Sequence, residues 1–172
     1  MSTMVAMVFD DESTAFEMRG ELVKMQNQFL LDMDDAVVVT RDARGKTKLH
    51  QAVSLTAAGA VSGSFWGMLV GLLFLNPLLG VAIGAGAGAL AGKFREIGLD
   101  DRMMGEIRAA LKPGSSALFV IIRNVTVDKV LDGLKQFSGR GRVFQTSLSK
   151  DDERALREVL ETPETPETEK AA

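Results

Sequence analysis

Short apolar runs alternate with segments of helical spacing in the first fifty residues. Residues 4–9 form an apolar run of strand length, and large apolar side chains recur every three or four positions between residues 12 and 30, which predicts a helix. The β-branched run 36–40 predicts a strand, and the turn-forming segment 41–45 separates it from a returning strand over 46–50. This region is therefore predicted to fold as β-α-β-β.

The second half of the chain shows the same two periodicities. The predicted elements are a helix from Asp100 or Asp101 to Leu111, a strand over 116–123, a helix over 126–137, a strand over 142–147 and a helix from 149 to about 160. Without the middle of the chain, residues 4–123 follow the order β-α-β-β-α-β, which is that of the ferredoxin-like unit. The predicted fold class is α+β: a ferredoxin-like sandwich with an extra α-β-α, interrupted by a glycine-rich hydrophobic helical hairpin.

The middle of the chain carries no charge. The 44 residues between Lys48 and Lys93 contain no Asp, Glu, Lys or Arg. Glycine recurs there at every fourth position, in two series on either side of Asn76-Pro77: Gly59, Gly63, Gly67 and Gly71, then Gly80, Gly84, Gly88 and Gly92. Residues four apart share one face of a helix, and glycine there lets another backbone approach closely. Two helices, over about 57–75 and 78–92, are predicted to pack through these glycines against each other or against a second subunit.

The length of this hairpin favours a membrane span. Its first helix has 19 residues and would be about 28 Å long, close to the ~30 Å of a hydrocarbon core, whereas the second would reach only about 22 Å. A transmembrane hairpin is therefore the preferred interpretation, with a shallow membrane-inserted hairpin and a soluble hairpin buried in an oligomer as alternatives. The basic residues that flank the hairpin are Arg44, Lys46, Lys48, Lys93 and Arg95. By the positive-inside rule they place both termini in the cytoplasm, at a bacterial inner membrane.

These patterns divide the chain into four segments. Residues 1–53 and 98–161 form the two parts of a cytoplasmic α+β domain, and residues 54–97 form the hairpin. Residues 162–172 repeat a Pro-Glu-Thr unit without large apolar side chains, which predicts a disordered acidic tail.

The composition offers little chemistry for catalysis. The chain has no cysteine and no tyrosine, one histidine and a net charge of −3. This excludes thiol chemistry and does not favour a nucleic-acid binder. His50 is expected at the surface or a boundary, and the pairs Asp10-Asp11, Asp34-Asp35 and Asp100-Asp101 are expected to cap helices or fill turns. Thr14 with Glu17, and Ser149 with Asp152, have the spacing of capping boxes. No catalytic residue, metal site, cofactor or small-molecule substrate is predicted.

Several segments resemble an uncharacterised prokaryotic family, a domain of unknown function whose members are described as membrane proteins. The segments that carry the resemblance are 8–11, 35–39, 48–51, 56–71, 72–80, 97–101, 111–118 and 146–150. The resemblance covers most of residues 4–160 and excludes the acidic tail. It implies a bacterial membrane-associated protein with a glycine-rich hairpin, and it implies no activity or active site.

The sequence thus predicts a non-enzymatic, membrane-associated protein. We expect it to self-associate through the hairpin glycines and to present its α+β domain on the cytoplasmic face, with membrane lipid and further copies of itself as partners. Two alternatives remain: an oligomeric channel or transport accessory, and a soluble homo-oligomer with the hairpins bundled in its core.

Overall fold

The computed structural model describes residues 3–51, 101–144 and 148–163. These residues form an α+β fold with one five-stranded antiparallel sheet and four α-helices. The elements are β1 (Thr3–Phe9), α1 (Thr14–Asn27), β2 (Leu31–Arg41), β3 (Thr47–Gln51), α5 (Asp101–Ala110), β4 (Ser115–Val125), α6 (Val127–Leu134), a 3-10 turn (Lys135–Phe137), β5 (Gly141–Val143) and α7 (Lys150–Glu161). The predicted α+β class is confirmed.

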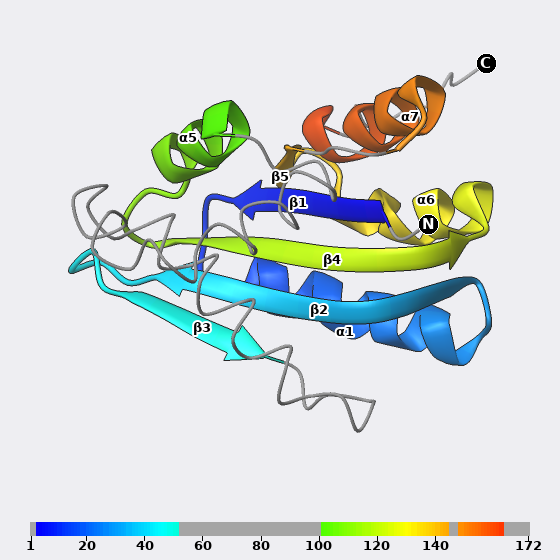
Figure 1. The fold of residues 1–172 in the computed structure, drawn as a ribbon, viewed down its shortest axis with the longest axis horizontal. Coiled ribbons are helices and arrows are strands. Elements are labelled where there is room, and N and C mark those ends of the chain that lie inside the picture. Colours follow the sequence, from blue (N-terminus) through cyan, green and yellow to red (C-terminus); the bar gives the residue numbers. More distant parts are fainter. Residues whose placement is uncertain (1–2, 52–100, 145–147, 164–172) are drawn as a thin grey trace, which may run out of the picture.

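The strands lie in the order β3-β2-β4-β1-β5, and every neighbouring pair is antiparallel (Figure 1). In the ferredoxin-like unit assigned from the sequence, β3 would be an internal strand. It lies instead at the edge of the sheet and pairs only with β2, while β4 fills the place between β2 and β1. The predicted assignment of strands to a ferredoxin-like unit is therefore not confirmed.

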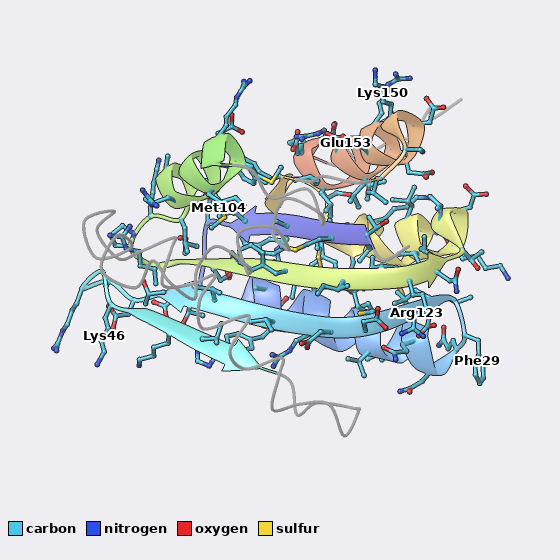
Figure 2. The ribbon with its side chains drawn as sticks, in the orientation of Figure 1. Phe29, Lys46, Met104, Arg123, Lys150 and Glu153 are labelled. Atoms are coloured by element: carbon cyan, nitrogen blue, oxygen red, sulfur yellow. The ribbon has the colours of Figure 1, made fainter. Side chains whose placement is uncertain are left out.

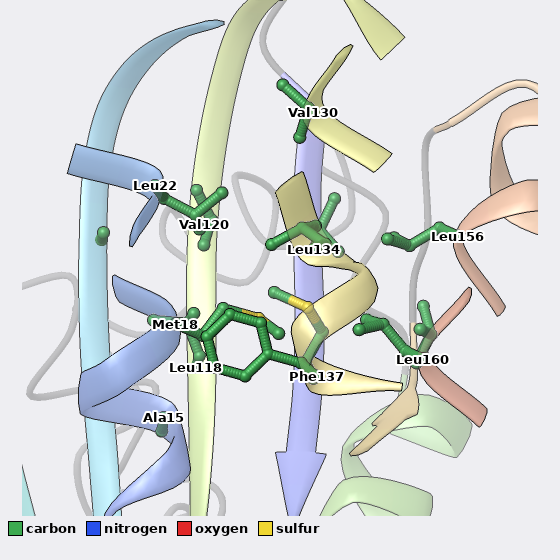
Figure 3. Close-up of a cluster of buried hydrophobic side chains, with 14 of the residues drawn as sticks. Ala15, Met18, Leu22, Leu118, Val120, Val130, Leu134, Phe137, Leu156 and Leu160 are labelled. Atoms are coloured by element: carbon green, nitrogen blue, oxygen red, sulfur yellow. The ribbon is translucent and has the colours of Figure 1, made fainter. Parts of the chain in front are cut away.

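One face of the sheet, here called the first face, is covered by α1, α6 and α7 (Figure 3). Side chains alternate along each strand, so every second residue of β1, β2 and β4 points to these helices. The core there includes Phe9 and Val120 from the strands, Met18 from α1, Leu134 from α6 and Leu160 from α7. Burying one such side chain stabilises the fold by roughly 1.5–3 kcal/mol.

The opposite, second face carries the other half of the strand residues. Met4, Val37 and Phe119 are each 0% exposed there, and Ile107 and Leu111 belong to the same cluster. Among the described helices, only α5 contributes to this cluster. Because both faces are buried, β1 and the second half of β2 contain almost continuous apolar runs instead of an alternation of apolar and polar residues.

The expected membrane location is corrected by the structure. No helix within residues 3–51, 101–144 and 148–163 is long and apolar enough to cross a membrane. The longest of these helices, α1, has 14 residues, or about 21 Å against a hydrocarbon core of ~30 Å. The transmembrane helix and the inner-membrane location with two cytoplasmic termini were therefore wrong predictions. The segment 54–97 itself, and the acidic tail beyond Pro163, lie outside the described residues.

Candidate functional site

The residues predicted to pack within the glycine-rich helical hairpin, or to flank it, lie mostly outside the described part of the chain. This applies to Lys93, Arg95 and all the series glycines: Gly59, Gly63, Gly67, Gly71, Gly80, Gly84, Gly88 and Gly92.

Arg44, Lys46 and Lys48 are described and lie in the β2–β3 hairpin. The turn is held by the Asp42 carboxylate, which accepts from the amides of Arg44 (3.0 Å) and Lys46 (2.9 Å), and Gly45 adopts a φ of 81°. The predicted turn over 41–45 is confirmed.

A cavity of about 320 Å³, with several polar residues in its lining, lies beside this hairpin, at the β3 edge of the sheet. We call it the edge pocket. It is lined by Glu12, Ser13, Phe16, Thr40, Asp42, Lys48 and His50. Glu12 and Ser13 directly precede α1 and Phe16 lies in its first turn. The others come from β2, β3 and the turn between them, so the pocket lies where α1 meets the sheet edge.

Strand register brings the polar residues of the pocket together. Thr40 pairs with Lys48, and Val38 pairs with His50. Val38 belongs to the core under α1. Thr40 lies two residues after Val38 and Lys48 two residues before His50, so both side chains point to the same face of the sheet as Val38. Residues 16 and 19 of α1 are three positions apart, which places Phe16 and Arg19 side by side above this face.

His50 is held by neighbours on both elements. Its Nε2 lies 2.9 Å from the Thr40 hydroxyl, and its ring meets the Phe16 ring edge-on at 5.0 Å between centroids. The Arg19 guanidinium donates to the His50 carbonyl oxygen (2.8 Å) and lies 5.3 Å from the centre of the Phe16 ring. These contacts fix the imidazole against α1, and no described residue hydrogen-bonds its Nδ1.

The electrostatics of the pocket favour the uncharged form of His50. Burial lowers the pKa of His50, and the positive charges of Arg19 and Lys48 lower it further. A neutral imidazole offers one N–H donor and one acceptor nitrogen. The pocket therefore combines a fixed imidazole with one cationic side chain, Lys48, and with the carboxylates of Glu12 and Asp42.

Asp11 fixes the start of α1 beside the pocket. Its carboxylate accepts from the amides of Ser13 (2.8 Å) and Thr14 (2.6 Å) and from the hydroxyls of both residues. Burial alone would raise the pKa of Asp11, but these hydrogen bonds outweigh it and lower the pKa to about 2. The capping role predicted for Asp11 is confirmed.

The capping box predicted at Thr14 and Glu17 does not form. Ser13 is the N-cap residue, and Glu17 instead accepts from the Arg140 guanidinium (3.2 Å). Arg140 also donates to the Thr14 hydroxyl (2.7 Å), so it ties the start of α1 to the segment before β5. At α7, by contrast, the predicted cap is confirmed: the Ser149 hydroxyl accepts from the Asp152 amide (3.1 Å).

The other two acidic pairs lie differently from the prediction. Asp34 and Asp35 lie within β2, not at a strand end, and Asp34 forms an ion pair with Arg123 of β4. Asp100 is outside the described residues, and Asp101 is the first residue of α5. Within the described part of the chain, no three His, Asp or Glu residues converge on a position that could hold a metal ion.

The sequence pointed to only part of the edge pocket. His50 was expected at a boundary, which its half-buried position matches, but Phe16, Arg19 and Thr40 were not singled out. The hairpin register could have identified Thr40, because a turn at 41–45 sets it opposite the residues near Lys48. Nothing in the local sequence indicates that α1 lies over that end of the hairpin.

The comparisons with known proteins place the chain in a family. The sequence profile of the DUF1269 family, described as a protein of unknown function, matches residues 60–161, which is more than half of the chain. The chain belongs to the DUF1269 family. No curated protein and no solved structure matched it. The matched region begins after β3, so all residues that line the edge pocket lie outside it.

Proposed function

We propose that this DUF1269 protein is a non-enzymatic binding protein that takes up a small organic anion, a carboxylate or a phosphate, in the edge pocket. The observation that carries the proposal is the position of the only histidine of the chain in a cavity of about 320 Å³ together with Lys48 and a hydroxyl partner. This volume lies at the lower end of the range for small-molecule sites, roughly 300–1,000 Å³.

The donors of the pocket favour an anion. Lys48 is exposed at the rim, and its ammonium group is a strong donor to carboxylate or phosphate oxygens. His50 can donate a further hydrogen bond, whereas the Ser13 hydroxyl in the lining already donates to the Asp11 carboxylate. Of the two carboxylates in the lining, that of Asp42 already accepts two backbone amides of the turn, which leaves Glu12 at the rim.

The geometry favours binding over catalysis. Thr40 is the hydroxyl nearest to His50, but it is only 5% exposed, so a substrate has little access to its oxygen. The Phe16 ring contacts the His50 ring, and the Arg19 guanidinium donates to the His50 carbonyl of β3. This arrangement positions donors around a ligand, and the buried Thr40 hydroxyl gives His50 no accessible nucleophile to activate.

The single histidine provides a direct test. In full-length protein, the imidazole C–H resonances of His50 should shift saturably when inorganic phosphate or acetate is added. The His50 pKa should rise when the anion is bound, because a nearby negative charge favours the protonated ring. The variant Lys48→Met should weaken binding about tenfold, the size of one charge-assisted hydrogen bond.

Lys46→Met is the matched control, because Lys46 is an exposed lysine of the same hairpin that does not line the pocket. It should bind anions as well as the unsubstituted protein. Resonances that do not move with either anion, or an equal loss of binding in both lysine variants, would refute the proposal.

We also propose that the described core is a ferredoxin-like arrangement with a large insertion. The elements β1, α1, β2, β4, α6 and β5 follow the order β-α-β-β-α-β, with β1 and β4 as the two inner strands. The Gly114 amide donates to the Arg41 carbonyl (2.7 Å), so residues 42–114 leave the four strands β2, β4, β1 and β5 and return to them at one point. This proposal fits a binding site built partly by the inserted β3.

Self-association through the two glycine series remains part of the proposed function. The regular spacing of eight glycines supports it, since a face of small residues permits close helix packing. If the proposal holds, Gly63→Leu or Gly84→Leu lowers the oligomer mass of the purified protein while the far-UV signal of the sheet domain is retained. An unchanged oligomer mass in both variants would refute it.

A further inference from the structure

Three side chains with nitrogen donors follow one another along β3 and the turn before it: Lys46, Lys48 and His50. They are two positions apart, and the Asp42 amide donates to the Lys46 carbonyl (2.9 Å), so the pairing of the two strands extends to Lys46. Side chains two positions apart along a strand point to the same face of the sheet. We call these three residues the donor row. Figure 2 shows Lys46 at the end of the sheet opposite Phe29, an exposed residue in the turn between α1 and β2.

The spacing of the donor row fits a ligand that carries more than one anionic group. A strand rises about 3.3 Å per residue, so neighbouring members of the row are roughly 7 Å apart. Lys48 and His50 line the edge pocket, whereas Lys46 lies outside its lining. A single anionic group inside the pocket therefore meets Lys48, and a second group linked to it reaches Lys46 at the mouth.

The two lysines of the row form no ion pair with a carboxylate of the described residues. The carboxylate of Asp42, in the same hairpin, already accepts from two amides of the turn. By contrast, Arg123 at the opposite end of the sheet forms an ion pair with Asp34. The ammonium groups of Lys46 and Lys48 are therefore available as charged donors to an anionic ligand.

Arg19 of α1 adds a further positive charge beside the row. Its guanidinium donates to the His50 carbonyl oxygen (2.8 Å). Burial lowers the pKa of His50, and the charges of Arg19 and Lys48 lower it further, so both cations act on the same ring. Like charges held close together repel one another, and a ligand with several negative charges relieves this repulsion at more than one point.

We propose that the ligand of the edge pocket is a small molecule with two or more linked phosphate groups. One phosphate lies at Lys48 and His50, and the next reaches Lys46. This inference rests on the anion site proposed above and adds the class of its ligand. Phosphate suits the row better than carboxylate because each group brings more charge and three acceptor oxygens, and the flexible lysine stem accommodates the spacing.

Calorimetric titration of the full-length protein in metal-free buffer tests this inference. The probes are inorganic phosphate and tripolyphosphate. Tripolyphosphate should bind at least about tenfold more tightly than phosphate, which is the size of one further charge-assisted hydrogen bond. Lys46→Met should remove this gain and leave the binding of phosphate itself unchanged.

Lys112→Met is the matched control, because Lys112 is an exposed lysine that lies between α5 and β4, outside the donor row. It should keep the full gain for tripolyphosphate, and the thermal midpoint of each variant checks its fold. Adenosine triphosphate distinguishes two sources of linked phosphates. Binding as tight as that of tripolyphosphate supports a nucleotide, and binding at least about tenfold weaker supports an inorganic chain.

Removing a negative charge from the pocket gives an independent check. Glu12 contributes an exposed carboxylate to the lining, so Glu12→Gln should strengthen the binding of tripolyphosphate. Phosphate binding that depends on Lys48 but shows no gain for tripolyphosphate would overturn this inference and leave the anion site standing. Equal losses in Lys46→Met and Lys112→Met would overturn it too, because the attraction would then be unspecific. Absence of binding for both probes would refute the anion site as well.

Discussion

The two faces of the sheet are built from the same strands but are covered in different ways. Three helices from both ends of the chain, α1, α6 and α7, pack on the first face, whereas α5 is the only described helix that packs on the second. The first face also keeps an apolar cavity of about 50 Å³, lined by residues such as Val130, Leu131 and Leu156, while Phe119 on the second face is completely buried. The comparison indicates that the helices of the first face do not fill all the space between them. Substitutions on the two faces should therefore differ in their effect on the free energy of unfolding.

Neighbouring residues of β4 provide the sharpest test of this difference. Leu118 points to the first face and Phe119 to the second, and both are 0% exposed. Phe119→Ala should destabilise the protein by about 3–5 kcal/mol. Leu118→Ala should cost less, about 2–4 kcal/mol, because it removes fewer buried atoms. Urea unfolding of both variants gives the two values, and a larger loss for Leu118→Ala would contradict the comparison.

A substitution at Gly141 tests how closely the first face is packed at a position outside its cavity. A Cβ at this position would lie 2.7 Å from the buried Phe9 ring. Phe9 is 0% exposed and cannot move freely, so Gly141→Ala should destabilise the fold by about 1–3 kcal/mol. Gly105→Ala is the control, because a Cβ at that helical position meets nothing within 4 Å. A thermal midpoint that is unchanged by Gly141→Ala would show that the packing around Gly141 has room for a methyl group.

Asp11 tests how firmly α1 is held on the first face. Loss of its hydrogen bonds in Asp11→Ala should lower the stability by about 1 kcal/mol at pH 7, the usual effect of removing a helix cap. The pKa of Asp11 is lowered by folding from 3.8 to about 2, so its contribution is present above pH 4 and is lost as the pH falls toward 2. The stability difference between the variant and the unsubstituted protein should therefore shrink over that pH range. A difference that stays constant from pH 6 to pH 3 would exclude this role.

The smallest expected effect is a gain from filling the cavity of the first face. Val130→Ile adds one methylene to a residue that lines it, and a buried methylene contributes roughly 0.8 kcal/mol. We expect an increase of about 0.5 kcal/mol, measured by urea unfolding, since part of the gain is offset by fixing the longer side chain. Val37→Ile, on the second face, is the matched control and should be neutral or destabilising.

The elements themselves were largely predictable from local patterns. The apolar runs of β1 and β2, the helical spacing of α1 and the turn at 41–45 all have local causes, and each lies where the sequence indicates. The edge pocket was only partly predictable. Thr40 and His50 come from one hairpin, but Phe16 in the lining and Arg19, which binds the His50 carbonyl, come from a helix that is distant in sequence. The prediction that Asp34 and Asp35 lie at a strand end was wrong, because β2 begins at Leu31, before its apolar run.

The sequence by itself determined the α+β class, the order of the elements and the start of α7 at Ser149, since propensity, periodicity and capping act over a few residues. Only the tertiary structure decided that β4, and not β3, lies beside β1, that α5 covers the face opposite α1, and that Phe29 is left exposed in a strained turn. Strand order and the choice of face depend on which distant surfaces bury each other best. That competition involves the whole chain, and no local pattern records its outcome.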